Sequence, residues 1–182
     1  MEYCQKSIHP TQAQIKFHPD TGHFEGYASV FNGNDCYDDT ILPGAFNQVL
    51  QAQPNIKMFY NHHRDGLPIG KWISLQEDAI GLYVKGELTP GNREAENLKA
   101  AIQHGTVDGL SIGYRIQPGD FYTKSEGGRI IHNISELEEI SIVNFPADRA
   151  AKLTVLSIKS AMQYSHEIKN IFKKYSLPTF HQ

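Results

Sequence analysis

A single stretch of strand-like alternation limits the possible folds of this chain more than any other feature. Residues 109–116 place Leu, Ile, Tyr and Ile on one side of an extended backbone and Gly, Ser, Gly and Arg on the other. The first side suits a hydrophobic core, whereas the second carries the hydroxyl of Ser111 between Gly109 and Gly113. Glycine weakens a strand, so this pair indicates that another backbone or a ligand comes close, and a peptide beside the strand would meet the hydroxyl unobstructed. The simpler alternative is a strand serine satisfied by the backbone or by water.

Short alternating stretches, bounded by turn residues, continue on both sides of this strand. They predict strands at residues 13–17, 23–31, 56–60, 71–75, 82–88, 129–134, 137–143 and 153–158. Helical spacing predicts helices over residues 45–51 and from about residue 93 to a C-cap at Gly105, and residues 118–128 are predicted to be a polar, mobile loop. The sequence therefore predicts an α+β protein, a mostly antiparallel β-barrel or sheet surrounded by a few α-helices.

The length of 182 residues predicts one domain with a sizeable core. We expect a flexible N-terminal arm over residues 1–11, the folded domain over 12–158, and a C-terminal amphipathic helix and tail over 159–182. The apolar side of that last helix predicts either docking to another copy, which would make the protein a homo-oligomer, or packing back on its own barrel.

Charge and cysteine usage narrow the function classes. The net charge of -3, without a basic run, predicts no nucleic-acid partner. No apolar run approaches the roughly 18 residues of a membrane-spanning helix, and the N-terminus lacks the profile of a signal peptide. Cys4 and Cys36 have no metal-ligand spacing, which indicates a reducing compartment. We therefore expect a soluble, cytoplasmic protein with no membrane contact and no cofactor.

A serine is a weak nucleophile and needs a base within hydrogen-bond reach. The best candidate is His62, which follows a predicted strand and opens a polar loop. Two adjacent histidines cannot both point into one site from an extended backbone, so at most one of His62 and His63 would act. The alternative is a solvated loop histidine.

The orienting acid is sought in the strand over residues 137–143. Glu139 shares a face with Ser141 if that strand is regular, and a carboxylate on a half-buried face needs a cationic or hydrogen-bonding partner. The alternative, an edge-strand carboxylate in water, fits Glu136 and Glu138 at least as well. A β-bulge near Glu138 would exchange the two faces.

Two rival chemistries use the same residue types. A zinc ion could in principle be bound by a subset of six side chains, although none has the helical His-x-x-x-His spacing: His62, His63, Asp65, His104, Asp108 and His132. A cysteine nucleophile at Cys36 is weaker still, because the neighbouring aspartates disfavour a thiolate.

Four segments, in this order, resemble the HK97-type prohead maturation proteases of tailed bacteriophages, a serine peptidase family. They are GYASVF (26–31) leading to LPGAF (42–46), YNH (60–62) leading to PIGK (68–71), GLSIGY (109–114), and LEEISIVNFPA (137–147). The likeness covers about residues 12–157. It implies a fold related to the herpesvirus assemblins, a closed and mostly antiparallel barrel with helices around it.

The resemblance also implies an activity and its residues. Members of that family cut the scaffolding part of the capsid protein, and often themselves, inside the immature capsid (prohead) in the host cytoplasm. The family's nucleophile, base and acid fall on Ser111, His62 and Glu139. Asp148 stands where the family commonly has asparagine, with its role open, and candidates for the oxyanion hole are the amides near residues 144–149 or at Gly113. Other readings are an inactive capsid-associated interaction module and a metal-dependent hydrolase.

Overall fold

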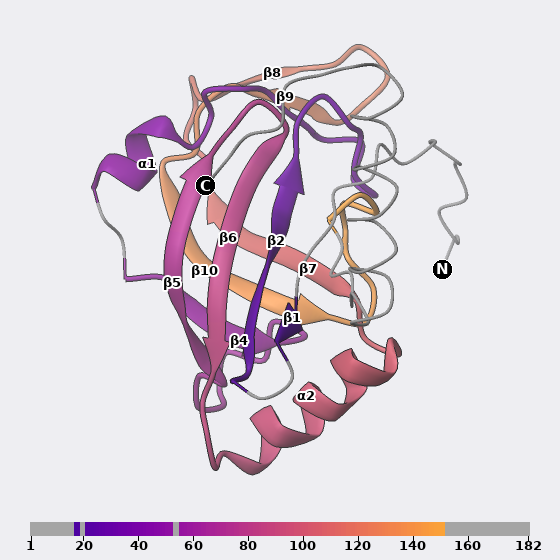
Figure 1. Cartoon of the computed structure of the whole chain (residues 1–182). Helices are drawn as coiled ribbons and strands as arrows, with labels where there is room; N and C mark the ends of the chain where they lie inside the picture. Colours follow the sequence, from indigo (N-terminus) through magenta and orange to yellow (C-terminus); the bar gives the residue numbers. More distant parts are fainter. Residues whose placement is uncertain (1–16, 19–20, 53–54, 152–182) are drawn as a thin grey trace, which may run out of the picture.

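The structure is a computed structural model that describes residues 17–18, 21–52 and 55–151. Its elements, in chain order, are β1 (Phe17–His18), β2 (His23–Val30), β3 (Thr40–Ile41), α1 (Asn47–Gln51), β4 (Lys57–Tyr60), β5 (Gly70–Glu77), β6 (Gly81–Leu88), α2 (Arg93–His104), β7 (Gly109–Arg115), β8 (Phe121–Thr123), β9 (Arg129–Ile131) and β10 (Glu136–Val143). Figure 1 shows α2 at one end of a curled sheet and the β8–β9 pair at the other.

Seven strands form the main sheet, in the order β1-β2-β6-β5-β4-β10-β7. Neighbouring strands run antiparallel except β4 and β10, which are parallel. A three-stranded sheet of β3, β9 and β8 accompanies it. The confirmed fold class is therefore a nearly closed, mostly antiparallel barrel with two helices outside it, as the alternation predicted.

The barrel closes between β2 and β7, which approach each other although they are not paired in the sheet. Residues 147–151 bridge this seam. The backbone N–H of Val30 on β2 donates to Asp148 Oδ2 at 2.8 Å, and that of Leu110 on β7 donates to the Ala151 carbonyl at 3.0 Å. A short irregular segment thus supplies the hydrogen bonds that a direct strand pair would otherwise make.

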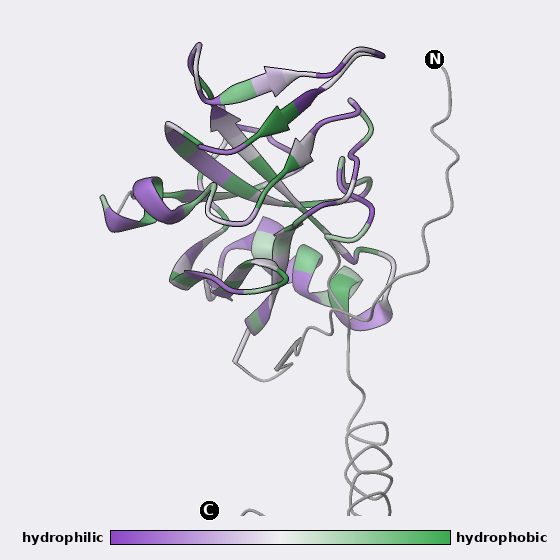
Figure 2. Cartoon of the chain, turned by 90° about the horizontal axis from the view of Figure 1, so that it is seen from above, coloured by the Kyte–Doolittle hydropathy of each residue, from purple (hydrophilic) through white to green (hydrophobic). Residues whose placement is uncertain are grey.

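Hydrophobic and hydrophilic residues alternate along the strands in Figure 2. The buried hydrophobic side chains form one core cluster. The largest fully buried side chains come from six strands (β2, β4, β6, β7, β9 and β10), from helix α2 and from connecting segments: Phe24, Phe46, Met58, Ile69, Leu82, Ile102, Leu110, Ile131, Ile134, Ile140 and Ile142. Helix α2 covers one end with Ala95, Leu98 and Ile102 buried. Its ends have the predicted chemistry, since the Asn92 side chain accepts from the Ala95 N–H at 3.0 Å and Gly105 caps the C-terminus in the left-handed region.

One predicted loop is wrong. Residues 118–128 contain β8, which pairs with β9. The segment is held by hydrogen bonds that no periodicity reveals: Asp120 accepts from the side chains of Asn133 and Ser135, and Lys124 donates to Asn34 and Thr40. These polar residues anchor the segment to its neighbours rather than keep it in solvent.

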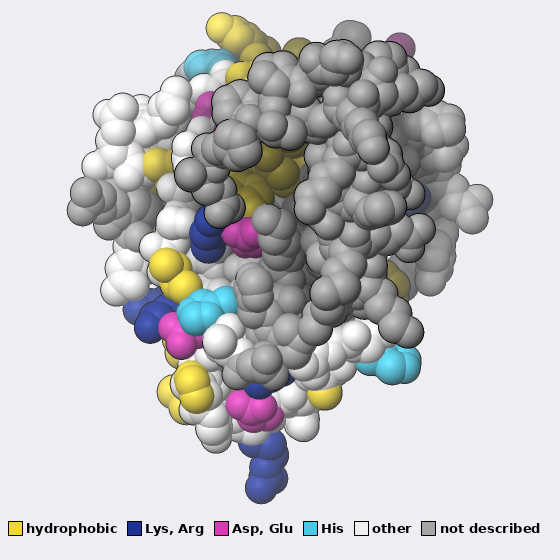
Figure 3. All heavy atoms as spheres, in the orientation of Figure 1, with side chains coloured by type: hydrophobic (Ala, Val, Ile, Leu, Met, Phe, Trp, Pro, Cys, Tyr) yellow, Lys and Arg dark blue, Asp and Glu magenta, His cyan; other side chains and the backbone are white. Residues whose placement is uncertain are grey.

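Four expectations fall wholly or mostly outside the described residues: the arm over 1–11, the strand over 13–17 except its last residue, the strand over 153–158, and the amphipathic helix over 159–182. Within the described residues, neither helix is long and apolar enough to cross a membrane. On the face seen in Figure 3, basic and acidic side chains of the described part lie next to one another. Two ion pairs of this kind are Lys85–Glu25 at 3.1 Å and Lys71–Glu87 at 2.7 Å.

Candidate active site

The side chains of His62 and Glu139 meet although 77 residues separate them in the chain. The parallel pairing of β4 with β10 brings them together, because His62 follows β4 and Glu139 lies on β10. His62 Nδ1 is 2.6 Å from Glu139 Oε1. The Glu139 side chain is 2% exposed and that of His62 44% exposed. A buried carboxylate is costly unless hydrogen-bonded, and here one oxygen meets the imidazole, whose other nitrogen is left for chemistry at the surface.

A tight turn aims the histidine. Asn61 and His62 have φ angles of 49° and 59°, in the left-handed region that non-glycine residues seldom adopt. The side chain of Asn61 supports this turn by accepting from the Asn144 N–H at 3.0 Å, and Asn144 accepts in turn from the Tyr60 hydroxyl at 2.8 Å. The ring of His63 is exposed and makes no hydrogen bond or ion pair within the described residues. Of the two adjacent histidines, it is His62 that contacts the acid.

Ser111 lies on β7, one strand further along the sheet. It is directly opposite Ser141 of β10, which is opposite Phe59 on the other side. Ser111 is 6% exposed, and its hydroxyl makes no hydrogen bond within the described residues. The three residues singled out by sequence thus lie on, or just after, three neighbouring strands of the sheet: His62 after β4, Glu139 on β10 and Ser111 on β7. The acid and the histidine are in direct contact, and the serine lies on the next strand.

The glycines that flank Ser111 make room for the chain itself, which corrects the expectation of an unobstructed serine face. A β-carbon at Gly113 would lie 2.9 Å from Glu139 Cδ, and one at Gly109 would lie 2.8 Å from Pro146 Cδ. The space beside Gly113 is therefore occupied by the Glu139 carboxylate.

The predicted risk of a β-bulge is real, yet Glu139 keeps its contact with His62. The β10–β7 register shifts between Leu137 and Glu139. Glu138 points to the surface, where it accepts from Arg115 Nε at 2.6 Å and from Arg64 at 2.7 Å. These two hydrogen bonds, that of Arg115 first, lower the pKa of the Glu138 carboxyl.

Glu136 is a second exposed acid of β10, and its Oε2 lies 3.5 Å from Arg115 Nε. Glu136 and Glu138 are therefore surface carboxylates in an ion-pair network. The sequence allowed this surface position for both as the alternative to a role in the site.

Asp148 takes a structural position in the barrel seam. Besides the Val30 amide it accepts the Ala150 N–H at 2.9 Å, and burial raises the pKa of its carboxyl. Two of the suggested oxyanion donors are already engaged: the Asn144 N–H donates to Asn61, and the Gly113 N–H faces β10. The Leu110 N–H donates to Ala151 and so points away from β10. Backbone N–H groups of successive residues in a strand point to opposite sides, so that of Gly113, three residues further along, points toward its β10 partner Glu139.

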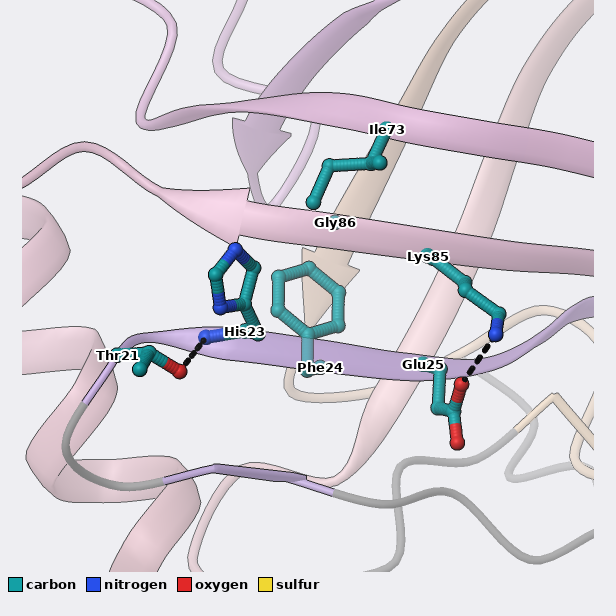
Figure 4. A pocket seen from close by; sticks show the side chains of 7 residues that line it. All are labelled: Thr21, His23, Phe24, Glu25, Ile73, Lys85 and Gly86. Carbon is teal, nitrogen blue, oxygen red and sulfur yellow. Dashed lines mark hydrogen bonds and ion pairs between the residues drawn. The ribbon is translucent and has the colours of Figure 1, made fainter.

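Within the part of the chain that the structure describes, no three His, Cys, Asp or Glu side chains lie close enough together to hold a metal ion. A shallow pocket of about 410 Å³ lies over β2, β5 and β6, and none of the three candidates lines it. Figure 4 shows its lining residues, among them Phe24 beside Gly86 and the Glu25–Lys85 ion pair.

Sequence reasoning singled out the three candidates but missed the residue that links two of them, the histidine and the acid. Ser141 is fully buried, donates to Glu139 and accepts the backbone N–H of His62. The sequence feature that could have indicated Ser141 is the alternation along the strand, which places Ser141 and Glu139 on the same face.

The chain is similar to several known phage proteins. A family model described as caudovirus prohead serine protease matches residues 11–167. The prohead protease of Enterobacteria phage HK97 is 46% identical over 168 residues, which cover 91% of this chain and 74% of that protein. The probable capsid maturation protease of Lactococcus phage p2 is 30% identical over 95 residues, 44% of this chain and 50% of that protein.

Two solved structures align with about three quarters or less of the chain. That of the bacteriophage T4 capsid assembly protease covers 74% of this chain and 82% of its own length at a TM-score of 0.51 and 11% identity, a likeness of fold. A structure of KSHV protease in complex with a hexapeptide phosphonate inhibitor aligns over 71% of this chain and 62% of its own at a TM-score of 0.44 and 15% identity.

Proposed function

Since this chain belongs to the caudovirus prohead serine protease family and is a serine endopeptidase, we propose that it uses Ser111 as nucleophile, His62 as general base and Glu139 as orienting acid. The observation that carries this assignment is the 2.6 Å contact between His62 Nδ1 and the buried Glu139 carboxylate, one strand away from Ser111. A base oriented by a third group, next to a hydroxyl, is the arrangement that nucleophilic acyl transfer requires.

In the proposed mechanism, Ser111 Oγ attacks the scissile carbonyl carbon while His62 Nε2 takes the hydroxyl proton. The carbon–nitrogen bond then breaks as His62 returns that proton to the leaving amine, and water releases the acyl group from Ser111 by the same steps in reverse. Glu139 keeps the imidazole in the tautomer whose Nδ1 carries the proton and stabilises the imidazolium. Among the described residues, His62 and Ser111 are not hydrogen-bonded to each other. In the proposed mechanism this hydrogen bond forms when substrate binds.

The proposed substrate is the scaffolding part of the major capsid protein, together with the protease itself, inside the immature capsid. Support comes from the relatives, which are a prohead protease and probable capsid maturation proteases. A homo-oligomer in the prohead, with no nucleic-acid or membrane partner, completes the proposal.

Co-expression of the chain with its capsid protein tests the assignment. Ser111→Ala should abolish cleavage of the scaffolding part while circular dichroism and melting temperature stay near wild type, because losing one hydroxyl from a small residue leaves almost no cavity. Persistent cleavage by the purified variant would refute Ser111 as nucleophile. Intact capsid protein with the wild-type chain would favour the inactive module, and cleavage that a chelator stops would favour the metal-dependent hydrolase.

A further inference from the structure

We propose that Ser141 is a positioning residue that fixes both the acid and the base of this site. The inference rests on the proposed roles of Glu139 and His62. The Ser141 hydroxyl donates to Glu139 Oε2 at 2.6 Å and accepts the backbone N–H of His62 at 3.2 Å. With the 2.6 Å contact between His62 Nδ1 and Glu139 Oε1, these bonds form a closed ring of three residues.

Each bond of the ring removes a different freedom. The carboxylate of Glu139 is held at both oxygens, one by Ser141 and one by His62, so it cannot rotate about its last torsion without losing a partner. The backbone N–H of His62 is held in a left-handed turn, a conformation that needs support from its surroundings. A single hydroxyl therefore holds the carboxylate that the imidazole meets and the main chain that carries the imidazole.

Packing alone does not account for a serine at this position. Ser141 is 0% exposed and lies between Ile140 and Ile142, which are also fully buried. A hydroxyl taken out of water is costly unless bonded, and alanine would fill the position without that cost. Its oxygen is used as donor and as acceptor at once, toward the two residues that the proposed mechanism needs in register.

Among the residues that the structure describes, His62 is the one titratable side chain that contacts the Glu139 carboxylate. On β4 its strand partner Lys57 is exposed and its Nζ donates to Asn55. On β7 its partner is Gly113, and its β10 neighbour Glu138 is paired with two arginines at the surface. Within the described residues, the hydrogen bonds of the Glu139 carboxylate are those to His62 and Ser141.

The test separates the effect of the Ser141 hydrogen bonds from the effect of side-chain volume at position 141. Ser141→Thr and Ser141→Val have the same shape, but only threonine can make both hydrogen bonds, and Ser141→Ala removes the hydroxyl without adding volume. Ser135→Ala is the matched control, because the Ser135 hydroxyl also donates to a carboxylate, that of Asp120, and Ser135 lies in the connection between β9 and β10, before the strand that carries Glu139. Each variant reacts with a serine-directed phosphonofluoridate, and the maximal labelling rate and the half-saturating probe concentration are determined per folded molecule below the melting temperature.

We expect Ser141→Ala and Ser141→Val to lower the maximal labelling rate by about 10- to 100-fold, the range for losing a hydrogen bond to a charged group, with unchanged half-saturation. Ser141→Thr should recover most of the rate, and Ser135→Ala should label like the wild type. A merely structural serine would lower the melting temperature and leave the rate per folded molecule unchanged. That result, or equal rates for the threonine and valine variants, overturns the inference.

The outcome for Ser111 separates the two proposals. If Ser111→Ala is unlabelled and Ser141→Ala reacts at the wild-type rate, the catalytic assignment stands and only the positioning role fails. If Ser111→Ala is still labelled, the catalytic assignment fails, whatever Ser141→Ala does.

Discussion

Replacing Gly113 by alanine tests whether the missing side chain at this position serves the acid. The added β-carbon would lie 2.9 Å from Glu139 Cδ and 3.0 Å from Cγ, whereas ordinary contacts begin at 3.4 Å. The carboxyl group must therefore move by at least half an ångström, and it has no slack, because His62 and Ser141 hold its two oxygens. The substitution adds one methyl group and should be felt almost entirely at the carboxylate.

The expected loss of activity follows from that displacement. Moving a reacting constellation by about 1 Å costs about 10²-fold in rate, so a shift of roughly half to one ångström should cost about 10- to 100-fold. The free energy of unfolding should fall by about 1–3 kcal/mol, the usual cost of adding a methyl group to a well-packed site.

The assay is the maximal labelling rate with a phosphonofluoridate, accompanied by urea unfolding. Gly33→Ala is the neutral control, because nothing lies within 4 Å of its added β-carbon. Gly86→Ala is the control for overpacking: its β-carbon would meet Phe24 and Met58 at 2.8 Å, among core side chains. We expect Gly86→Ala to lower stability but not the rate per folded molecule. Wild-type labelling by folded Gly113→Ala would refute the reasoning.

Two further predictions concern carboxylates. Glu139→Gln should lower the cleavage rate by about 10²-fold or more, because it removes the charge that stabilises the imidazolium. Glu138→Gln should cleave at nearly the wild-type rate, because Glu138 belongs to a surface ion-pair network. The reverse result would show that Glu139 is not the orienting acid. Burial raises the pKa of Asp148, so the folded state favours the protonated carboxyl group. The unfolding free energy of the wild type, measured relative to that of Asp148→Asn, should therefore rise as the pH falls from 7 toward about 4, the ordinary pKa of aspartate. Urea unfolding at several pH values measures that difference, and a constant or falling difference would contradict it.

The family and the fold could be predicted because their signals are local. The β5–β6 hairpin, the caps of α2 and the alternating faces of β7 follow from residues within a few positions of one another. The prohead protease family was identifiable from four segments, and the comparisons confirm it.

What the sequence could not provide depends on long-range pairing. Glycines beside Ser111 signalled a close approach but not that the Glu139 side chain is what approaches. The left-handed turn at Asn61 and His62 is supported by hydrogen bonds with Asn144 and Ser141, which are 83 and 79 positions away from them. The barrel seam is supported by the contact of Asp148 with Val30. The polar residues that flank β8, Asp120 and Lys124, were indistinguishable from loop residues because their hydrogen-bond partners lie on other segments.

The identity of the nucleophile is the central claim, and one measurement tests it most directly. The purified chain is treated with a phosphonofluoridate, digested and mapped by mass spectrometry. The proposed mechanism predicts a single adduct on Ser111 that disappears in His62→Ala, since the hydroxyl then has no base. An adduct on a different serine, or an undiminished Ser111 adduct in folded His62→Ala, would contradict it.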